Sequence, residues 1–286
     1  MKNTVLFGAG QIGMMCRRLM GAEYKLLCFA DNYPGKWGTT VSGLPVCSPE
    51  EALDLKPDCV VCCVLDDERS GAMKHQLGEL GYTGEFVTPA QLKTFDARYA
   101  TMRLLAEQIG ELDIPGDAAE LGVFRGDFAA AINAAFPDRR IHLFDTFTGF
   151  DEADIVLEAQ RGYSRAKTGD FADTAQELVA QRLPYREKAV FHPGFFPDSF
   201  SGCEGLRFAF VSLDADLYAP TAAALPLFYD RLVPGGVLLV HDVLSTQYAG
   251  VQQAVNEFCR PRGILPLPVC DLHGSVVIRK PLANQS

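Results

Sequence analysis

Two apolar stretches near the end of the chain decide its expected fold: FVSLDADLYAPT (residues 210–221) and GGVLLVHDV (residues 235–243). Both begin with a short, continuous apolar run, which is typical of strands that are buried on both faces of a parallel sheet. Further towards the N-terminus, similar short strands are expected in AAELGV, RIHLFD and AVFHPG, with segments of helical length between the strands. This alternation predicts an α/β domain with a parallel sheet.

Acidic residues stand at the point where each of the two predicted strands ends. Asp214 and Asp216 end the first strand, and His241 and Asp242 end the second. In a parallel sheet, ligands bind outside the carboxyl ends of the strands. Three carboxylates and an imidazole at such an edge indicate a site for a hard divalent cation, because crowded carboxylates otherwise repel each other and take up protons. The expected role of this edge is therefore catalytic.

The composition is that of a folded, acidic protein. The chain has 286 residues, of which 48% are hydrophobic and 22% charged, and its net charge is -10. This length allows two domains, and the acidic balance disfavours a nucleic-acid partner. No membrane span and no secretory signal are recognisable in the sequence. The nine cysteines, three of them in the apolar run CVVCCV, are expected to be reduced thiols, which predicts a cytoplasmic location.

A smaller Rossmann-like unit is expected in residues 1–90. Gly8, Gly10 and Gly13 follow a predicted strand and open a predicted helix, as in dinucleotide-binding loops, where the helix N-terminus offers N–H groups to a phosphate. Asp31 ends the second predicted strand, 18 residues beyond Gly13, where a carboxylate would bind a ribose. However, ninety residues supply little more than one mononucleotide-binding half. The following sequence resembles small domains at the front of sugar-processing and polysaccharide-assembly proteins, so a bound nucleotide and a structural or docking role both stay open.

A connecting helix is expected in residues 91–114. Apolar residues recur in this region at helical spacing, at Leu92, Phe95, Tyr99, Met102, Leu105 and Ile109. The second unit, residues 115–286, follows this helix. Within it, the polar segment 150–168 is expected to be a mobile loop or lid over the second domain.

The second unit begins with a looser glycine motif. Glu120, Gly122 and Gly126 surround the turn after its first predicted strand, and Asp145 ends the next strand. In a Rossmann-type sheet, an acid at this point can accept hydrogen bonds from both ribose hydroxyls of an adenosyl cofactor. This arrangement resembles that of class I S-adenosylmethionine-dependent methyltransferases.

Several motifs in the right order make the resemblance more specific. The stretches ELGVFRG, LFDTFTGFDEAD, FHPGFFPDSF, VSLDADLYAPTAAALPLFYDRLVPGG and HDV are similar to the macrocin O-methyltransferase family, over about residues 115–280. The resemblance implies a seven-stranded sheet with S-adenosylmethionine over its first strands. It also implies a Mg2+-dependent methyl transfer to a hydroxyl, often on a sugar of a natural product, and it is compatible with a homo-oligomer.

The resemblance also implies roles for individual residues. Those for the cofactor are Glu120, Gly122, Gly126 and Asp145, and those for the metal are Asp214, His241 and Asp242. Asp216 would bind the ion, orient a ligand or act as the base, and His241 is a second candidate for the base. The sequence departs from the family at His241, where a second acid is more common. An imidazole favours softer ions, so Mn2+, Fe2+ and Zn2+ stay open beside Mg2+.

The sequence is compatible with three functions. The expected one is a metal-assisted O-methyltransferase that acts on a sugar or another polyhydroxylated small molecule. The second is an inactive methyltransferase-like protein that docks to a polysaccharide-assembly partner, and the acids at both strand ends argue against it. The third is a nicotinamide-dependent oxidoreductase that uses Gly8, Gly10, Gly13 and Asp31, although the sequence offers no obvious hydride-transfer residue.

Overall fold

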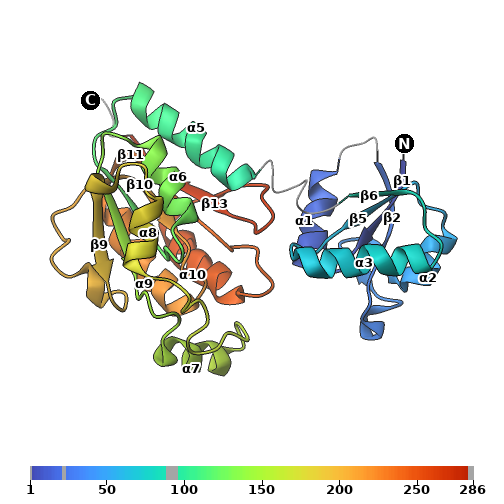
Figure 1. Ribbon diagram of the computed structural model, residues 1–286. Helices are drawn as coiled ribbons and strands as arrows, with labels where there is room; N and C mark the ends of the chain where they lie inside the picture. The colour runs from blue at the N-terminus through green and yellow to red at the C-terminus, as the bar shows by residue number, and fades with distance from the viewer. Residues whose placement is uncertain (1, 21–23, 88–95, 283–286) are drawn as a thin grey trace. The chain divides into compact units, whose positions relative to one another are not determined.

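The structure, a computed structural model, describes residues 2–20, 24–87 and 96–282. The chain divides into two compact units (Figure 1). Unit 1 is formed by residues 1–97 and 270–273, and unit 2 by residues 98–269 and 274–286. Each unit is an α/β fold with a mainly parallel sheet, which confirms the expected fold class. No helix in the described ranges is long and apolar enough to cross a membrane.

Unit 1 contains a six-stranded sheet with the strand order β3-β4-β2-β1-β5-β6. Its strands are β1 (Lys2–Phe7), β2 (Tyr24–Ala30), β3 (Thr40–Val41), β4 (Leu44–Cys47), β5 (Cys59–Cys62) and β6 (Glu85–Val87), and its helices are α1 (Gln11–Leu19), α2 (Pro49–Asp54) and α3 (Asp67–Glu79). All neighbouring strands are parallel except β3 and β4. Because its strands and connections are short, the unit fits five parallel strands into a length that suggested little more than one mononucleotide-binding half.

Unit 2 contains the expected seven-stranded sheet, with the strand order β12-β13-β11-β10-β7-β8-β9. Its strands are β7 (Asp117–Leu121), β8 (Ile141–Asp145), β9 (Ala189–Pro193), β10 (Phe208–Leu213), β11 (Leu232–Val240), β12 (Leu267–Pro268) and β13 (Val276–Arg279). Strands β7 to β11 run parallel, whereas β13 pairs antiparallel with β11 and β12. Strands β10 and β11 are neighbours, with Leu213 opposite Val240, so their carboxyl ends lie side by side.

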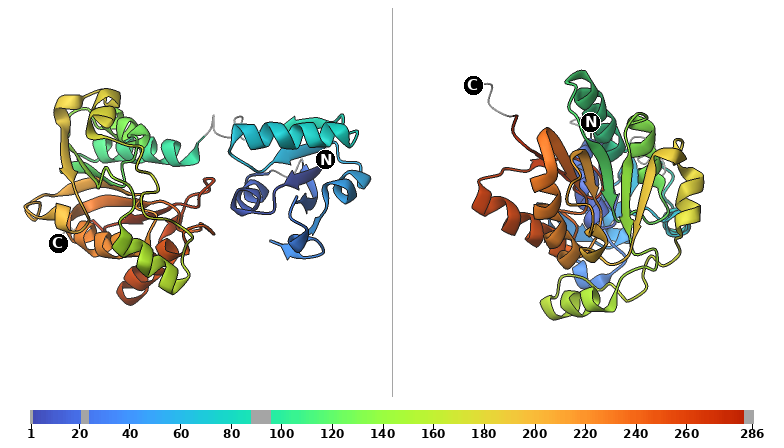
Figure 2. Two further views of the ribbon diagram at one scale, coloured as in Figure 1. Left: turned by 60° about the horizontal axis from the view of Figure 1, so that its bottom comes forward. Right: turned by 90° about the vertical axis from the view of Figure 1, so that its left-hand side faces the viewer.

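Helices cover both faces of this sheet (Figure 2). One face carries α5 (Ala97–Glu111), α6 (Asp127–Ala135) and α8 (Gln176–Arg182), and the other carries α9 (Tyr218–Arg231) and α10 (Ala249–Cys259). Successive residues of β7 face the two cores: Ala118 packs with Met102 of α5, and Ala119 packs with Phe228 of α9. Both faces of the strand are therefore buried, and the acid Glu120 is buried with its apolar neighbours.

The segment 150–168, which was expected to be a loop, contains helix α7 (Glu152–Arg161). Asp151 is its N-cap, and the side chain of Asp151 accepts a hydrogen bond from the backbone N–H of Ala153. Gly162 ends the helix in the left-handed conformation. An Asp N-cap and a C-terminal glycine specify a helix, and of the charged residues between them Glu152 and Arg161 are exposed, whereas Asp154 and Glu158 are buried. The expectation of a loop was therefore wrong for most of this segment.

Helix α5 forms residues 97–111 of the predicted connecting helix, and residues 112–114 are not helical, so the prediction ran three residues too far. Residues 91–95 of that prediction lie outside the described residues. The buried face of α5 includes Met102 and Ile109, as its spacing predicts. Arg98 lies on the same face, one turn before Met102, and is only 7% exposed, which the apolar pattern does not indicate.

The chain leaves β7 through Gly122, at a point where two strand ends come very close. Gly122 has a φ of +83°, and a Cβ at this position would lie 1.9 Å from the backbone oxygen of Asp214. Because that oxygen belongs to the end of the neighbouring strand β10, only a residue without a side chain fits here. Gly122 therefore allows the turn after β7 to lie against the acidic end of β10.

We expect Gly122→Ala to lower the free energy of unfolding by more than about 3 kcal/mol, because the left-handed backbone is strained and the clash can be relieved only by moving a strand end. Gly162→Ala is the matched control. Its φ of +66° is similar, but nothing lies within 4 Å of the added Cβ, so a loss of only about 1 kcal/mol is expected. Urea unfolding of the three proteins measures both losses. Equal losses would contradict the steric explanation.

Candidate active site

The candidate site lies at the carboxyl ends of β7, β8, β10 and β11 in unit 2. The backbone ladder of the sheet continues one residue beyond the strands. In this extension Gly122 N–H donates to Phe144 O at 3.0 Å, Asp214 N–H to Leu121 O at 2.8 Å, and His241 N–H to Leu213 O at 2.8 Å. The residues that follow the strands are therefore attached to one rigid edge.

Asp214, Asp216 and Asp242 meet at this edge. Each offers one carboxylate oxygen, and these oxygens all lie within 4.8 Å of one another. Asp216 reaches the cluster although its strand has ended, because the chain turns there with a φ of +58°, and Asp242 has a φ of +55°. Left-handed backbone at residues other than glycine costs energy and often marks active sites. Clustered carboxylate oxygens are also the ligands that hard divalent cations prefer.

His241 lies beside two of these acids. Its Nδ1 is 2.8 Å from Oδ1 of Asp214 and 3.1 Å from Oδ2 of Asp242. Burial disfavours a charged imidazole, but the charge of Asp214 and the hydrogen bonds to both acids raise the pKa of His241 to about 10. Without a cation, the ring therefore donates a proton to the acids. Adjacent ligands of an ion with bonds of about 2.1 Å lie about 3 Å apart, so a deprotonated Nδ1 in the same place fits a metal ligand.

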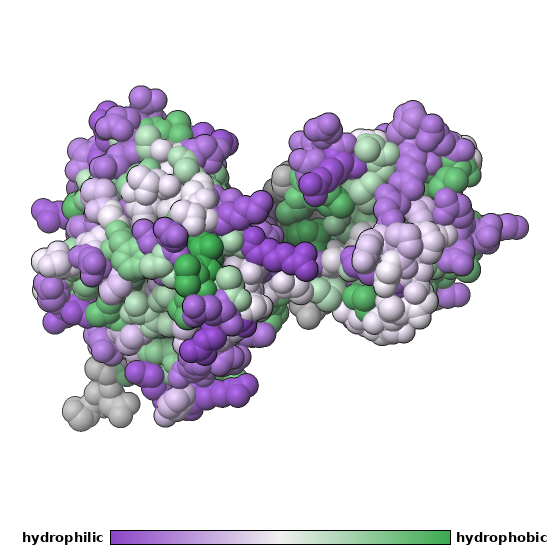
Figure 3. Space-filling view, turned by 90° about the horizontal axis from the view of Figure 1, so that it is seen from below, coloured by the Kyte–Doolittle hydropathy of each residue, from purple (hydrophilic) through white to green (hydrophobic). Residues whose placement is uncertain are grey.

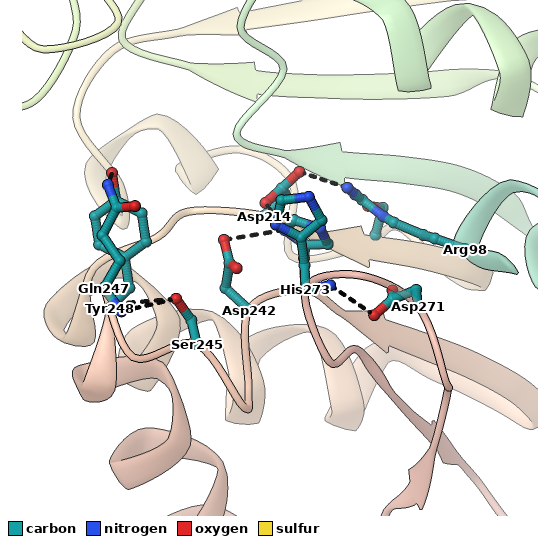
Figure 4. Close-up of polar contacts among 10 residues, drawn as sticks. Arg98, Asp214, Asp242, Ser245, Gln247, Tyr248, Asp271 and His273 are labelled. Carbon is teal, nitrogen blue, oxygen red and sulfur yellow. Dashed lines mark hydrogen bonds and ion pairs between the residues drawn. The ribbon is translucent and has the colours of Figure 1, made fainter. Parts of the chain in front are cut away.

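Arg98 contacts this site and was not predicted from the sequence. Its Nη1 donates to Oδ2 of Asp214 at 2.8 Å (Figure 4), and its Nη2 donates to Oγ of Ser212 at 3.2 Å. The guanidinium carbon lies 3.8 Å from the centre of the Phe128 ring. An arginine is rarely buried unless it is paired. The available signal was its position one turn before Met102, on the apolar face of α5.

Asp214 and Asp216 have very different pKa values, because Arg98 and His241 lower the pKa of Asp214. Burial alone would raise the pKa of Asp214, but Arg98 and His241 outweigh burial and lower this pKa to about 2. Burial, together with the charges of Asp214 and Asp242, raises the pKa of Asp216 well above its ordinary range. Asp214 is therefore a permanent anion, whereas Asp216 can carry a proton. Neighbouring acids with such different pKa values are typical of sites for proton transfer.

Asp145 binds the loop that follows β7. Its Oδ2 accepts hydrogen bonds from the backbone N–H groups of Val123 at 2.7 Å and Phe124 at 2.9 Å, and its Oδ1 accepts one from Phe147 N–H at 2.8 Å. A carboxylate has about four acceptor positions. Three of them are used within the protein, so about one is open to a ligand. Binding both ribose hydroxyls, as the sequence predicts, would require one of these bonds to be exchanged.

The other predicted cofactor residues lie on the same turn. Glu120 is buried, its Oε1 lies 3.4 Å from Oγ of Ser212, and burial raises its pKa well above the ordinary value. Gly126 is the left-handed N-cap of α6, and a Cβ there would lie 2.8 Å from Cγ1 of Val179. The turn is thus tightly packed on both sides. Through Ser212, Glu120 is also connected to the arginine that contacts the acid cluster.

An aromatic cluster lies next to this turn. The ring centres of Phe124 and Phe171 are 5.1 Å apart, those of Phe171 and Phe150 are 5.1 Å apart, and Tyr248 lies 6.4 Å from Phe150. Phe171 is 40% exposed. Figure 3 views the side on which α7 lies in Figure 1, where apolar side chains appear among polar ones. Unit 2 therefore offers apolar rings to a ligand beside its acids.

The predicted nucleotide residues of unit 1 lie together at the end of β1. Gly8 has a φ of +123°, Gly10 is the N-cap of α1, and a Cβ at Gly13 would lie 2.1 Å from the backbone oxygen of Gly8. The glycines therefore allow the close packing that a nucleotide loop requires. Asp31, however, is already paired, because its Oδ2 lies 2.9 Å from Nζ of Lys36. A ribose at Asp31 would have to compete with this ion pair.

Helix α7 is fixed to the same end of unit 2. Glu158 is 2% exposed, and its Oε1 accepts a hydrogen bond at 2.8 Å from the N–H of Tyr218, the first residue of α9. Asp154 lies one turn earlier on the same face of α7 and is 8% exposed. Burial raises the pKa of Asp154 to about 6. The helix therefore buries two acids near the start of α9.

The sequence matches one protein family over most of unit 2. The family model described as Macrocin-O-methyltransferase (TylF) matches residues 88–280. The 8-demethyl-8-(2,3-dimethoxy-alpha-L-rhamnosyl)-tetracenomycin-C 4'-O-methyltransferase of Streptomyces olivaceus is 30% identical over 201 residues, which cover 66% of this chain and 74% of that protein. The mycinamicin III 3''-O-methyltransferase of Micromonospora griseorubida is 28% identical over 163 residues, which cover 53% and 63% of the two chains. The glycine motif of unit 1 lies outside the family match.

Solved structures show the same fold. The O-methyltransferase NovP has a TM-score of 0.52 and 23% identity, covering 65% of this chain and 80% of that chain. The calicheamicin methyltransferase CalS11 also has a TM-score of 0.52 and 23% identity, covering 63% and 77%. These similarities confirm that unit 2 has the fold of a class I methyltransferase.

We expect Asp154→Asn to stabilise the protein by about 1–2 kcal/mol at pH 8. A carboxyl with a pKa of about 6 in the folded protein and about 3.9 in the unfolded chain binds its proton more tightly when folded. Its charge therefore destabilises the folded state above pH 6, although its place in the first turn of α7 offsets part of this cost. The gain should shrink as the pH falls through about 6 and be nearly absent at pH 4.

Urea unfolding at pH 8 and pH 4 measures this gain. The control is Glu152→Gln, which removes an exposed acid from the same helical turn and should give no gain at either pH. A gain of equal size at both pH values would show that charge burial is not its cause.

Proposed function

This chain belongs to the macrocin O-methyltransferase family of S-adenosylmethionine-dependent enzymes, and we propose that it methylates a hydroxyl of a sugar or another polyhydroxylated small molecule with the help of a divalent cation. The proposal depends above all on the cluster of Asp214, Asp216 and Asp242 with His241, at the sheet edge that also carries the glycine turn. A sugar acceptor is supported by the Streptomyces relative, which is named for 4'-O-methylation of a rhamnosyl-tetracenomycin.

The donor atoms fit a divalent cation. Nδ1 of His241 is spaced as a neighbouring ligand from Oδ1 of Asp214 and from Oδ2 of Asp242, and the three aspartates each offer one carboxylate oxygen within 4.8 Å of the others. The predominance of carboxylate oxygens favours Mg2+, while the imidazole also suits Mn2+ or Fe2+. A cation held by these residues would lower the pKa of an acceptor hydroxyl.

The protein residues divide the remaining tasks. Methyl transfer requires the donor and the acceptor oxygen to be aligned, so the rigid sheet edge and the packed turn at Gly122 serve orientation. Asp216 is the proposed base, because it lies in the cluster and its raised pKa lets its carboxylate accept a proton. His241 is the alternative base if it does not bind the cation. The rings of Phe150 and Phe171 offer an apolar surface for the C–H face of a sugar.

A nucleotide in unit 1 is a second, separate proposal. It is supported by the close packing at Gly8 and Gly13, which brings the backbone of the loop next to the start of α1. The ion pair of Asp31 with Lys36 weighs against the predicted ribose contact. We therefore expect NAD to bind only weakly, and a calorimetric titration tests this.

We expect S-adenosylmethionine to bind the purified protein with micromolar affinity, and Asp145→Ala to weaken this binding at least about 10-fold. The loss follows from the three backbone hydrogen bonds that Asp145 accepts, since a hydrogen bond to a charged group contributes about 1.5–3 kcal/mol. Calorimetric titration measures the affinity, with NAD as a control ligand.

The control variant for this titration is Asp138→Ala, which changes an exposed acid outside the site and should bind like the wild type. Absence of S-adenosylmethionine binding, or binding of NAD alone, would contradict the assignment of unit 2 as the cofactor site.

We expect the protein to bind one Mn2+ ion, used as a spectroscopic substitute for Mg2+, and Asp242→Asn to weaken this binding at least about 10-fold, because the variant loses an anionic ligand. Electron paramagnetic resonance of free Mn2+ measures the affinity. Asp230→Asn, an exposed acid of α9, is the control and should bind like the wild type. A wild-type protein that binds no Mn2+ would overturn the proposed metal assistance.

A further inference from the structure

Arg98 is a buried arginine that contacts the acid cluster from outside it. We propose that Arg98 is a positioning residue, which holds one oxygen of Asp214 so that the other faces the cation and the acceptor. This inference rests on the proposed function, because it assigns Asp214 to the cation site. It goes beyond that function by adding a residue of α5, a helix that none of the predicted site residues belongs to.

The two oxygens of Asp214 have different partners. Oδ2 accepts a hydrogen bond from Nη1 of Arg98 at 2.8 Å, and Oδ1 lies 2.8 Å from Nδ1 of His241. The hydrogen bond from Arg98 therefore fixes the orientation of the Asp214 carboxylate from the side away from the cluster. Residues that hold metal ligands in this way are about as important as the ligands themselves. Without Arg98, the Asp214 side chain could rotate and turn either oxygen towards the cation.

The guanidinium group is itself held on three sides. Its Nη1 contacts Asp214, its Nη2 contacts Oγ of Ser212 at 3.2 Å, and its plane lies on the ring of Phe128, 3.8 Å from the ring centre. These partners come from the end of β10 and from α6. The flat fork of an arginine satisfies all three contacts at once, whereas the point charge of a lysine cannot reproduce them.

Ser212 extends this arrangement towards the cofactor side. Its Oγ lies 3.4 Å from Oε1 of Glu120, which stands one residue before the end of β7. Arg98 therefore lies between the acid assigned to the cation and a buried acid assigned to the cofactor turn. A change at Arg98 should act on the geometry of Asp214 first, because that contact is the shorter and fully charged one.

A purely structural role makes a different prediction. Arg98 occupies a position on the apolar face of α5, where an apolar side chain of similar size would also fill the space. Replacing a buried ion pair by apolar groups is often neutral for stability, whereas removing one partner alone is destabilising. Stability alone therefore cannot distinguish the two roles, and the test needs a measurement that reports on Asp214.

The test compares Arg98→Lys and Arg98→Met with Arg103→Met, which changes an exposed arginine of the same helix. Mn2+ affinity is measured by electron paramagnetic resonance, and S-adenosylmethionine affinity by calorimetry. We expect both Arg98 variants to bind Mn2+ about 10- to 100-fold more weakly, while S-adenosylmethionine affinity changes less than about 3-fold. Arg103→Met should match the wild type in both measurements.

The lysine variant decides the outcome if the methionine variant does not fold. Wild-type Mn2+ affinity in Arg98→Lys would overturn the proposal, because the charge alone would then suffice. If the wild type itself binds no Mn2+, the metal part of the proposed function fails separately. In that case the 15N chemical shifts of the His241 ring, measured without metal, decide: a shift in Arg98→Lys but not in Arg103→Met supports positioning of Asp214, and unchanged shifts overturn it.

Discussion

The pairing of three parallel strand ends is the constraint on which the site depends. The backbone of Asp214 is bonded to the end of β7, and the backbone of His241 is bonded to the end of β10. The absence of a side chain at Gly122 lets these ends approach each other closely. Residues 28 positions apart in the sequence, Asp214 and Asp242, are thereby brought together without any flexible element between them and the sheet.

Charge balance is the second requirement of such a dense site. Three carboxylates this close repel one another, and burial makes each charge costlier. The positive groups of Arg98 and His241 offset part of this repulsion, and they act on Asp214 from opposite sides. At Asp216, burial and the two neighbouring carboxylates outweigh the charge of His241 and raise the pKa, so Asp216 is the acid most ready to hold a proton. The arrangement gives chemically identical side chains different tasks.

The sequence predicted the features that depend on strand order and on local patterns. The acids after β10 and β11 and the turn at Gly122 follow from short local motifs, whereas the seven-stranded sheet was implied by the family resemblance. Arg98 could not be predicted in this way, because its partner Asp214 lies 116 residues away and only the folded chain brings them together. Helix α7 was missed for a different reason: its charged residues concealed the capping signals at Asp151 and Gly162.

The hydrogen bonds of Asp145 have a consequence for the energetics of recognition. Because this carboxylate already orders the backbone at Val123 and Phe124, the turn has its shape before any small molecule arrives. Ordering a loop upon association costs conformational entropy, and a preorganised turn avoids most of this cost. Most of the conformational entropy lost on association at this turn should therefore be lost by the incoming molecule and not by the polypeptide.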